Sequence, residues 1–174
     1  MYIFKKALFL LHAVHLRFGT LLGGDAGVSI PDTSGLPVFA DNVLPSILVH
    51  LGIINLATGR REHLTKTFLA QSSTAEALLS PESEIQGQQG PTSDLIEGPT
   101  LFAQDAYIIR AAAVTACETI LRLARDITVA EGQYGDEVRN MSETQLDGWL
   151  WSISKKNAVF RALPRFVQTS TPFF

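Results

Sequence analysis

The chain has 174 residues, of which 46% are hydrophobic and 18% are charged, and its formal net charge is −3. These values are typical of one globular domain, and basic residues that gather into no long block argue against direct nucleic-acid binding. The single cysteine, Cys117, excludes an internal disulfide and favours a reducing, cytoplasmic compartment.

The N-terminal segment predicts an amphipathic helix from about residue 2 to about residue 17. Lys5 and Lys6 precede a short apolar run that resembles a secretory signal, but His12, His15 and Arg17 interrupt it. A secreted or membrane-tethered protein is an alternative that depends on this run alone. No stretch approaches the roughly 20 apolar residues of a membrane span. Apolar residues recur instead at helical spacing: Phe4, Leu8, Leu11, Phe18 and Leu22.

A glycine-rich loop is expected over residues 19–35, and a short extended piece over residues 36–40. A helix should begin near Leu44 or Pro45, with Ile47 and Leu48 on its apolar stripe. Two further helices are predicted at about residues 60–70 and 74–79, the second with a Ser73/Glu76 capping box. Residues 81–100 are rich in proline and glycine, which predicts a flexible surface insertion rather than a domain boundary.

The C-terminal part of the chain predicts two more helices. The last begins at Ser142, with Gln145 completing a capping box, and should bury Leu146, Trp149, Leu150 and Ile153. Residues 164–174 read as irregular, and strand signals are nearly absent, so the predicted fold class is mostly α. The longer helix has an apolar stripe of Phe102, Ala106, Ile109, Ala113, Ala116, Ile120, Leu123 and Ile127, whose alanines would let another helix approach closely.

Asp41 is the polar residue whose position is most informative. It follows an apolar segment and precedes a helix, so its carboxylate can cap the helix N-terminus, and propensity alone favours that interpretation. The alternative is a partly desolvated carboxylate that faces a cleft and stabilises developing positive charge.

Other polar and aromatic residues raise the same choice between structure and function. Lys5 and Lys6 are either solvated or meet an anion, and His12 and His15 are interpreted as solvated or core-edge histidines because no carboxylate ligand pattern accompanies them. Asp147 lies near the start of the last helix, where its charge would complement the helix dipole. Trp151 lies off the apolar stripe of that helix, where it could stack on a planar ligand. Arg110 and Glu118 are expected to form a buried network on the long helix.

Several sequence blocks, in the same order, resemble the queuosine-salvage N-glycosidase family. The most informative is Phe39-Ala40-Asp41-Asn42-Val43-Leu44-Pro45, followed by His50-Leu51-Gly52. The others are Phe4-Lys5-Lys6-Ala7, Arg110-Ala111-Ala112 with Glu118, Leu146-Asp147-Gly148-Trp149-Leu150-Trp151, and the ending from Leu163-Pro164 to Phe173-Phe174.

The resemblance implies a hydrolase that cleaves the N-glycosidic bond of queuosine 5′-monophosphate and releases queuine for transfer-RNA modification. It implies a helical fold like that of DNA glycosylases, a small-molecule substrate, no cofactor, no metal and no membrane. Asp41 takes the place of the catalytic carboxylate, which stabilises an oxocarbenium-like state or traps it covalently. Phe39, Asp147 and Trp151 are expected to line the base pocket. Lys5 or Lys6 is expected to hold the phosphate or the ribose hydroxyls.

The 7-deazaguanine base has no N7 to protonate, so the proton that assists its departure must go elsewhere on the ring. Asp147 is expected to recognise the guanine-like edge rather than to supply that proton.

Two departures from the family's pattern accompany the resemblance. Family chains are about twice this length, so residues 1–174 correspond to the C-terminal portion of the domain, and truncation at the N-terminus is expected. The family's basic tail is replaced by Arg165-Phe166-Val167-Gln168-Thr169. The alternative function is therefore a non-catalytic helical fragment or paralogue that keeps the core and binds a nucleoside or a partner protein.

Overall fold

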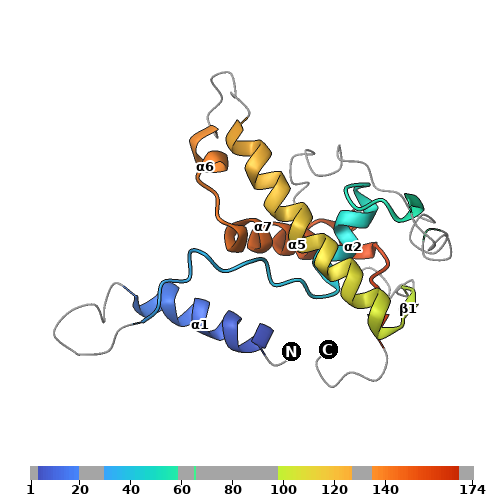
Figure 1. Cartoon of the computed structure of the whole chain (residues 1–174), viewed down its shortest axis with the longest axis horizontal. Helices are drawn as coiled ribbons and strands as arrows, with labels where there is room; N and C mark the ends of the chain where they lie inside the picture. Colours follow the sequence, from blue (N-terminus) through green and yellow to red (C-terminus); the bar gives the residue numbers. More distant parts are fainter. Residues whose placement is uncertain (1–3, 20–29, 59–64, 66–97, 127–134, 169–174) are drawn as a thin grey trace.

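The computed structural model describes residues 4–19, 30–58, 65, 98–126 and 135–168, and most of them are helical (Figure 1). The mostly α prediction is confirmed. The expected helices around residues 60–70 and 74–79 and nearly all of the 81–100 insertion lie outside the described residues. The elements are α1 (Phe4–Phe18), α2 (Val43–His50), the 3-10 helix η1 (Leu56–Thr58), β1 (Thr100–Leu101), α5 (Ala103–Asp126), α6 (Gly135–Arg139), α7 (Glu143–Lys156), α8 (Ala158–Ala162) and β2 (Val167–Gln168).

The short helix α2 is the centre of the core, and all of its residues are buried. Its apolar side chains, including Leu44 and Leu48, pack with Ala113 of α5, Leu146 of α7 and Phe160 of α8. A helix that is apolar on every side is typical of a buried core position. Ala113 is fully buried where α2 and α5 meet, as expected for a small residue that lets two helices approach closely.

The buried face of α5 differs from the predicted stripe. It consists of Ala106, Ile109, Ala113, Cys117 and Leu121. Ala116 and Ile120 are only half-buried, while Phe102 is 83% exposed and Leu123 is 52% exposed, so the prediction was wrong at both ends. After Ala113 the buried positions lie four residues apart, at Cys117 and Leu121. Cys117 packs as a small apolar side chain in the cluster with residues of α2 and α7. Ile127 lies outside the described residues.

The capping box of α7 is confirmed. Ser142 Oγ accepts the Gln145 backbone N–H at 3.2 Å, and Gln145 Oε1 accepts the Ser142 N–H at 2.8 Å. Leu146 and Leu150 are buried as predicted, whereas Trp149 is 47% exposed and not a core residue. From Leu146 to Ser154 the buried positions of this helix repeat every four residues, which turns Trp149 away from α2.

The C-terminal segment is more ordered than the predicted irregular tail. β2 pairs with β1 in parallel, with Thr100 opposite Val167. Phe166 is fully buried; its N–H donates to Ser46 Oγ at 3.3 Å, and its carbonyl accepts from Asn42 Nδ2 at 3.2 Å. These contacts hold residues 164–168 against α2. Residues 169–174 lie outside the described part of the chain.

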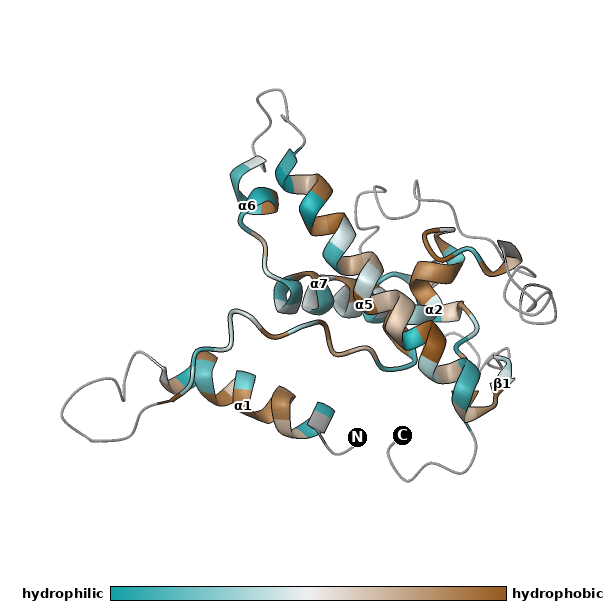
Figure 2. Ribbon diagram, viewed as in Figure 1, coloured by the Kyte–Doolittle hydropathy of each residue, from teal (hydrophilic) through white to brown (hydrophobic). Residues whose placement is uncertain are grey.

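Helix α1 lies at the edge of the structure, and residues 30–41 run between it and the other helices in Figure 1. It carries hydrophobic as well as hydrophilic residues along its length (Figure 2). Phe9 is 58% exposed, Leu10 64% and Leu16 72%, so α1 is far less buried than α2. Among the described residues, no helix has the length and apolar character needed to cross a membrane.

Candidate functional site

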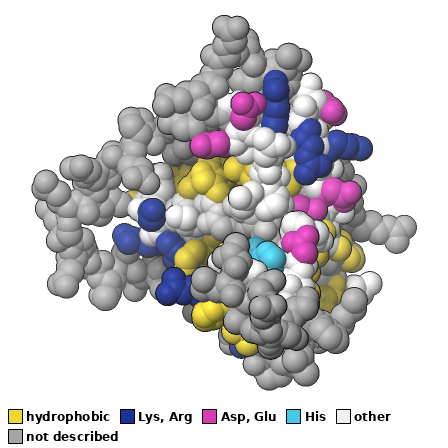
Figure 3. Space-filling model, turned by 90° about the vertical axis from the view of Figure 1, so that its left-hand side faces the viewer, with side chains coloured by type: hydrophobic (Ala, Val, Ile, Leu, Met, Phe, Trp, Pro, Cys, Tyr) yellow, Lys and Arg dark blue, Asp and Glu magenta, His cyan; other side chains and the backbone are white. Residues whose placement is uncertain are grey.

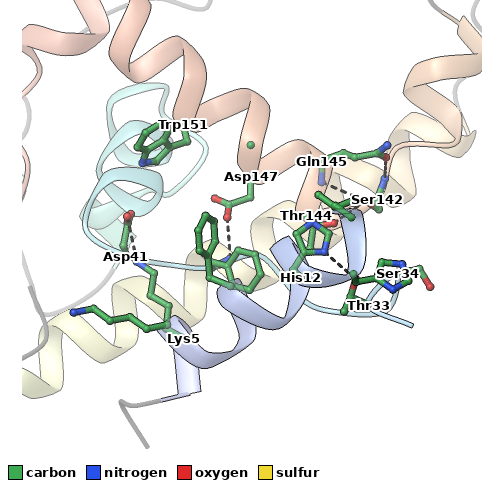
Figure 4. Close-up of a pocket in the computed structure, with 16 residues that line it drawn as sticks. Lys5, His12, Thr33, Ser34, Asp41, Ser142, Thr144, Gln145, Asp147 and Trp151 are labelled. Carbon is green, nitrogen blue, oxygen red and sulfur yellow. Dashed lines mark hydrogen bonds and ion pairs between the residues drawn. The ribbon is translucent and has the colours of Figure 1, made fainter. Parts of the chain in front are cut away.

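A pocket of about 840 Å³ lies between α1, residues 33–41 and the first half of α7 (Figure 4). We call α1 together with residues 30–41 the pocket wall. The volume is within the range of small-molecule binding sites. The lining residues are Lys5, Lys6, Phe9, His12, His15, Leu16, Thr33, Ser34, Phe39, Asp41, Ser142, Thr144, Gln145, Asp147, Gly148 and Trp151.

Two carboxylates of α7 fix the extended segment that crosses the pocket. Glu143 Oε2 accepts the backbone N–H of Val38 at 3.2 Å, and Asp147 Oδ2 accepts that of Phe39 at 3.1 Å. Residues at i and i+4 lie on one face of a helix, so the pair can hold neighbouring residues of one strand-like segment. Val38 and Phe39 are both buried there, and this anchoring determines where Asp41 lies.

The two carboxylate oxygens of Asp41 have different partners. Oδ1 accepts the N–H of Val43 at 2.7 Å and of Leu44 at 3.2 Å, which satisfies free donors in the first turn of α2. Oδ2 lies 3.2 Å from Lys5 Nζ. The helix-capping interpretation is therefore confirmed. The same side chain also lines the pocket, with 20% of its surface exposed, so capping does not remove it from the site.

The electrostatic environment of Asp147 differs from that of an exposed carboxylate. Burial raises the pKa of Asp147 from 3.8 to about 6; the Phe39 N–H and Lys5 oppose this rise, and the charge of Asp41 adds to it. Asp147 can therefore exchange a proton near neutral pH. Cys117, beneath it in the core, has its pKa raised to about 12 by burial and by the charges of Asp147 and Glu143, so its thiol is unreactive.

Aromatic rings occupy the middle of the pocket. The rings of Phe9 and Phe39 meet edge to face, with centroids 5.6 Å apart and an interplanar angle of 79°. Trp151 is 50% exposed at the pocket, and Lys155 Nζ lies 5.1 Å from its ring centroid. Apolar and aromatic walls with a few polar groups suit a planar heterocyclic ligand.

The far end of the pocket is polar and was missed by the sequence interpretation. His12 Nδ1 lies 2.9 Å from Thr33 Oγ1, and His15 Nε2 lies 3.9 Å from Asp32 Oδ1 (Figure 4 labels His12 and Thr33). Both histidines are half-buried, consistent with core-edge residues, yet both also line the pocket. Their spacing, three apart on a helix, was the available signal. The described residues include no cluster of potential metal ligands.

The structure brings most of the predicted site residues together. Lys5, Lys6, Phe39, Asp41, Asp147 and Trp151 all line the pocket, although they come from distant parts of the chain. Arg110 and Glu118 do not line it.

The buried network expected between Arg110 and Glu118 is wrong, because Glu118 is exposed. Arg110 donates to Gln168 Oε1 at 2.7 Å, and its guanidinium carbon lies 5.2 Å from the Phe166 ring centroid. It therefore supports the C-terminal segment.

On the face shown in Figure 3, the described basic side chains lie in separate groups, and acidic side chains lie around the upper of these groups. That face offers no continuous basic surface to a nucleic acid.

No protein-family model, curated protein or solved structure matches the chain.

Proposed function

We propose that this chain is an N-glycosidase that hydrolyses queuosine 5′-monophosphate and releases queuine for transfer-RNA modification. The observation that carries the proposal is the meeting of Lys5, Asp41 and Asp147 with Phe39 and Trp151 in one pocket. The proposal includes a cytoplasmic location, a DNA-glycosylase-like helical fold, a small-molecule substrate rather than a nucleic acid, and no metal or organic cofactor.

The chemistry requires a carboxylate beside the sugar carbon that loses its base. Breaking the C1′–N bond creates positive charge on the ribose, and a fixed carboxylate stabilises that charge or traps it. In the proposed complex, Asp41 Oδ2 faces C1′, while Oδ1 stays bound to the N-terminus of α2. The two backbone N–H bonds to Oδ1 hold the side chain in one orientation, which lowers the cost of positioning it.

The aromatic middle of the pocket suits the base, and the lysines suit the remaining part of the nucleotide. Phe39 and Phe9 offer ring surfaces to a planar base, and Trp151 lies at the same pocket. Lys6 is exposed and lines the pocket, so it is the better candidate for the phosphate, since Lys5 is already paired with Asp41.

The second candidate is a protein that binds the nucleotide without cleaving it. One observation favours it: both oxygens of Asp41 already have partners within the chain, a backbone pair and Lys5. A carboxylate used only as a cap would leave binding intact and produce no queuine.

The test is queuine release from queuosine 5′-monophosphate, with nucleotide binding measured on the same samples. Asp41→Asn keeps a capping acceptor but loses the charge, and we expect release to fall on the order of 10²- to 10³-fold. Asp136→Asn is the control, because Asp136 of α6 is exposed and does not line the pocket. Binding without release by the parent chain would support the second candidate. Equal release by the parent and Asp41→Asn would remove the role of Asp41.

A further inference from the structure

The two carboxylates of the pocket are in different chemical situations. Asp41 has a cation, Lys5, at 3.2 Å and two backbone N–H donors. Among the described residues, Asp147 accepts one hydrogen bond, from the Phe39 N–H to Oδ2. That bond uses Oδ2, and Oδ1 of this pocket-lining side chain accepts no hydrogen bond from the described residues.

The charged and titratable groups around Asp147 come from several elements. They are Asp41 before α2, Lys5 of α1, Cys117 of α5 and Glu143 one turn earlier on α7. The Cys117 thiol is neutral at physiological pH, since its pKa is raised to about 12. Burial and Asp41 therefore favour the protonated form of Asp147, against Lys5 and the Phe39 N–H, and bring its pKa to about 6. A carboxyl group that stays protonated close to neutral pH can donate a proton to a departing group.

We propose that Asp147 is the catalytic proton donor of this pocket, and that it delivers its proton from Oδ1 to the departing base. The inference rests on the proposed N-glycosidase function. As the C1′–N bond breaks, the bonding electron pair leaves with the base, and the proton of Asp147 goes to a ring nitrogen or the carbonyl oxygen of that base. A water molecule then adds its hydroxide to C1′, and its remaining proton returns to the Asp147 carboxylate. This role differs from the expectation drawn from the sequence, in which Asp147 recognises the base edge and does not supply the proton.

Glu143 provides an internal comparison for this role. It lies one turn before Asp147 on α7 and accepts the N–H of Val38, as Asp147 accepts the N–H of Phe39. Both carboxylates thus anchor the same segment, but Glu143 does not line the pocket. A purely structural role would make the two positions equivalent, whereas proton donation belongs to Asp147 alone.

The experiment compares two substrates on the full chain. One is queuosine 5′-monophosphate, whose base needs a proton to leave. The other is p-nitrophenyl riboside 5′-phosphate, whose leaving group departs as a stable anion. For Asp147→Asn, we expect a loss on the order of 10²- to 10⁴-fold on the first substrate, the usual contribution of a general acid, and a far smaller loss on the second. Glu143→Gln should treat the two substrates alike.

The pH dependence gives a second measurement. For the parent chain, kcat on the nucleotide should fall as pH rises through the pKa of Asp147, because the donor is lost. On the p-nitrophenyl substrate this alkaline limb should be absent. Equal losses on both substrates in Asp147→Asn, or an unchanged alkaline limb in that variant, would overturn proton donation and leave the glycosidase proposal standing. Cleavage of neither substrate by the parent chain would instead remove the proposed function itself.

Discussion

The core around α2 and the pocket wall are built in opposite ways. In the core, apolar side chains such as Leu48 and Phe160 are completely buried between helices. Within the wall, α1 is joined to residues 30–41 through polar pairs, among them Lys5 with Asp41 and His12 with Thr33, and through the Phe9–Phe39 ring contact. Four large apolar residues of α1 are exposed, namely Phe9, Leu10, Leu16 and Phe18.

Because of this difference, we expect stability to depend on the core and ligand binding and turnover to depend on the pocket wall. Burial of apolar surface supplies most of the free energy of folding, so the core should determine stability. The wall adds less to stability and supplies most of the residues that line the pocket, so changes there should act mainly on ligand binding and turnover. The comparison leads to three predictions about stability.

The largest effect is expected in the core. Leu48→Ala should lower the free energy of unfolding by about 2–5 kcal/mol, because the side chain is fully buried and its removal leaves a cavity. Leu10→Ala is the matched change in the wall, where the side chain is 64% exposed, and should alter stability by less than about 0.5 kcal/mol. Urea denaturation measures both. Equal losses would mean that α1 is as tightly packed as α2.

An intermediate effect is expected at Asp147, where core and pocket meet. Its folded pKa of about 6 lies above the ordinary value of 3.8, so the folded state binds this proton more tightly than the unfolded state. The stability that this provides is fully present below about pH 4 and is lost as pH rises towards 6. Asp147→Asn lacks this titrating group. Between about pH 4 and 6, its free energy of unfolding should therefore fall less than that of the parent chain.

Denaturation at a series of pH values tests this prediction, with Asp136→Asn, an exposed carboxylate of α6, as the control. An unchanged pH profile in Asp147→Asn would show that this carboxyl is as well solvated as a surface group. A variant that is more stable at neutral pH but less active would match the proposed proton donor.

The smallest effect is expected at the ion pair of the wall. The Lys5 side chain is 42% exposed and that of Asp41 20%, and such pairs contribute about 0–1 kcal/mol. Lys5→Met should therefore barely change the thermal unfolding midpoint, and Lys6→Met should change it even less. A large loss specific to Lys5→Met would indicate that the pair holds α1 in place.

Local signals in the sequence predicted part of this structure. The Ser142/Gln145 box, the position of Pro45 near the start of α2 and the mostly helical fold depend on residues a few positions apart, so sequence patterns carry them. The prediction failed where several faces of a helix are apolar. On α5 and α7 the packing of neighbouring helices determines which face is buried. Cys117 is therefore buried, whereas Trp149 is exposed.

The sequence interpretation named six of the residues that line the pocket, but it did not predict the shape of the pocket. The resemblance indicated Asp41 and Asp147, but not that consecutive N–H groups of Val38 and Phe39 would bind carboxylates of α7. His12 lines the pocket beside Thr33, and no local sequence pattern predicts the contact between these two side chains. The two-residue strands β1 and β2 are too short to show alternation, so the order of the C-terminal segment was also missed.

The most direct measurement is the release of free queuine when the parent chain is incubated with queuosine 5′-monophosphate, followed by mass spectrometry alongside Asp41→Asn. The account predicts release by the parent chain and a loss on the order of 10²- to 10³-fold in a variant that remains folded. No release by a folded parent chain that binds the nucleotide would contradict it.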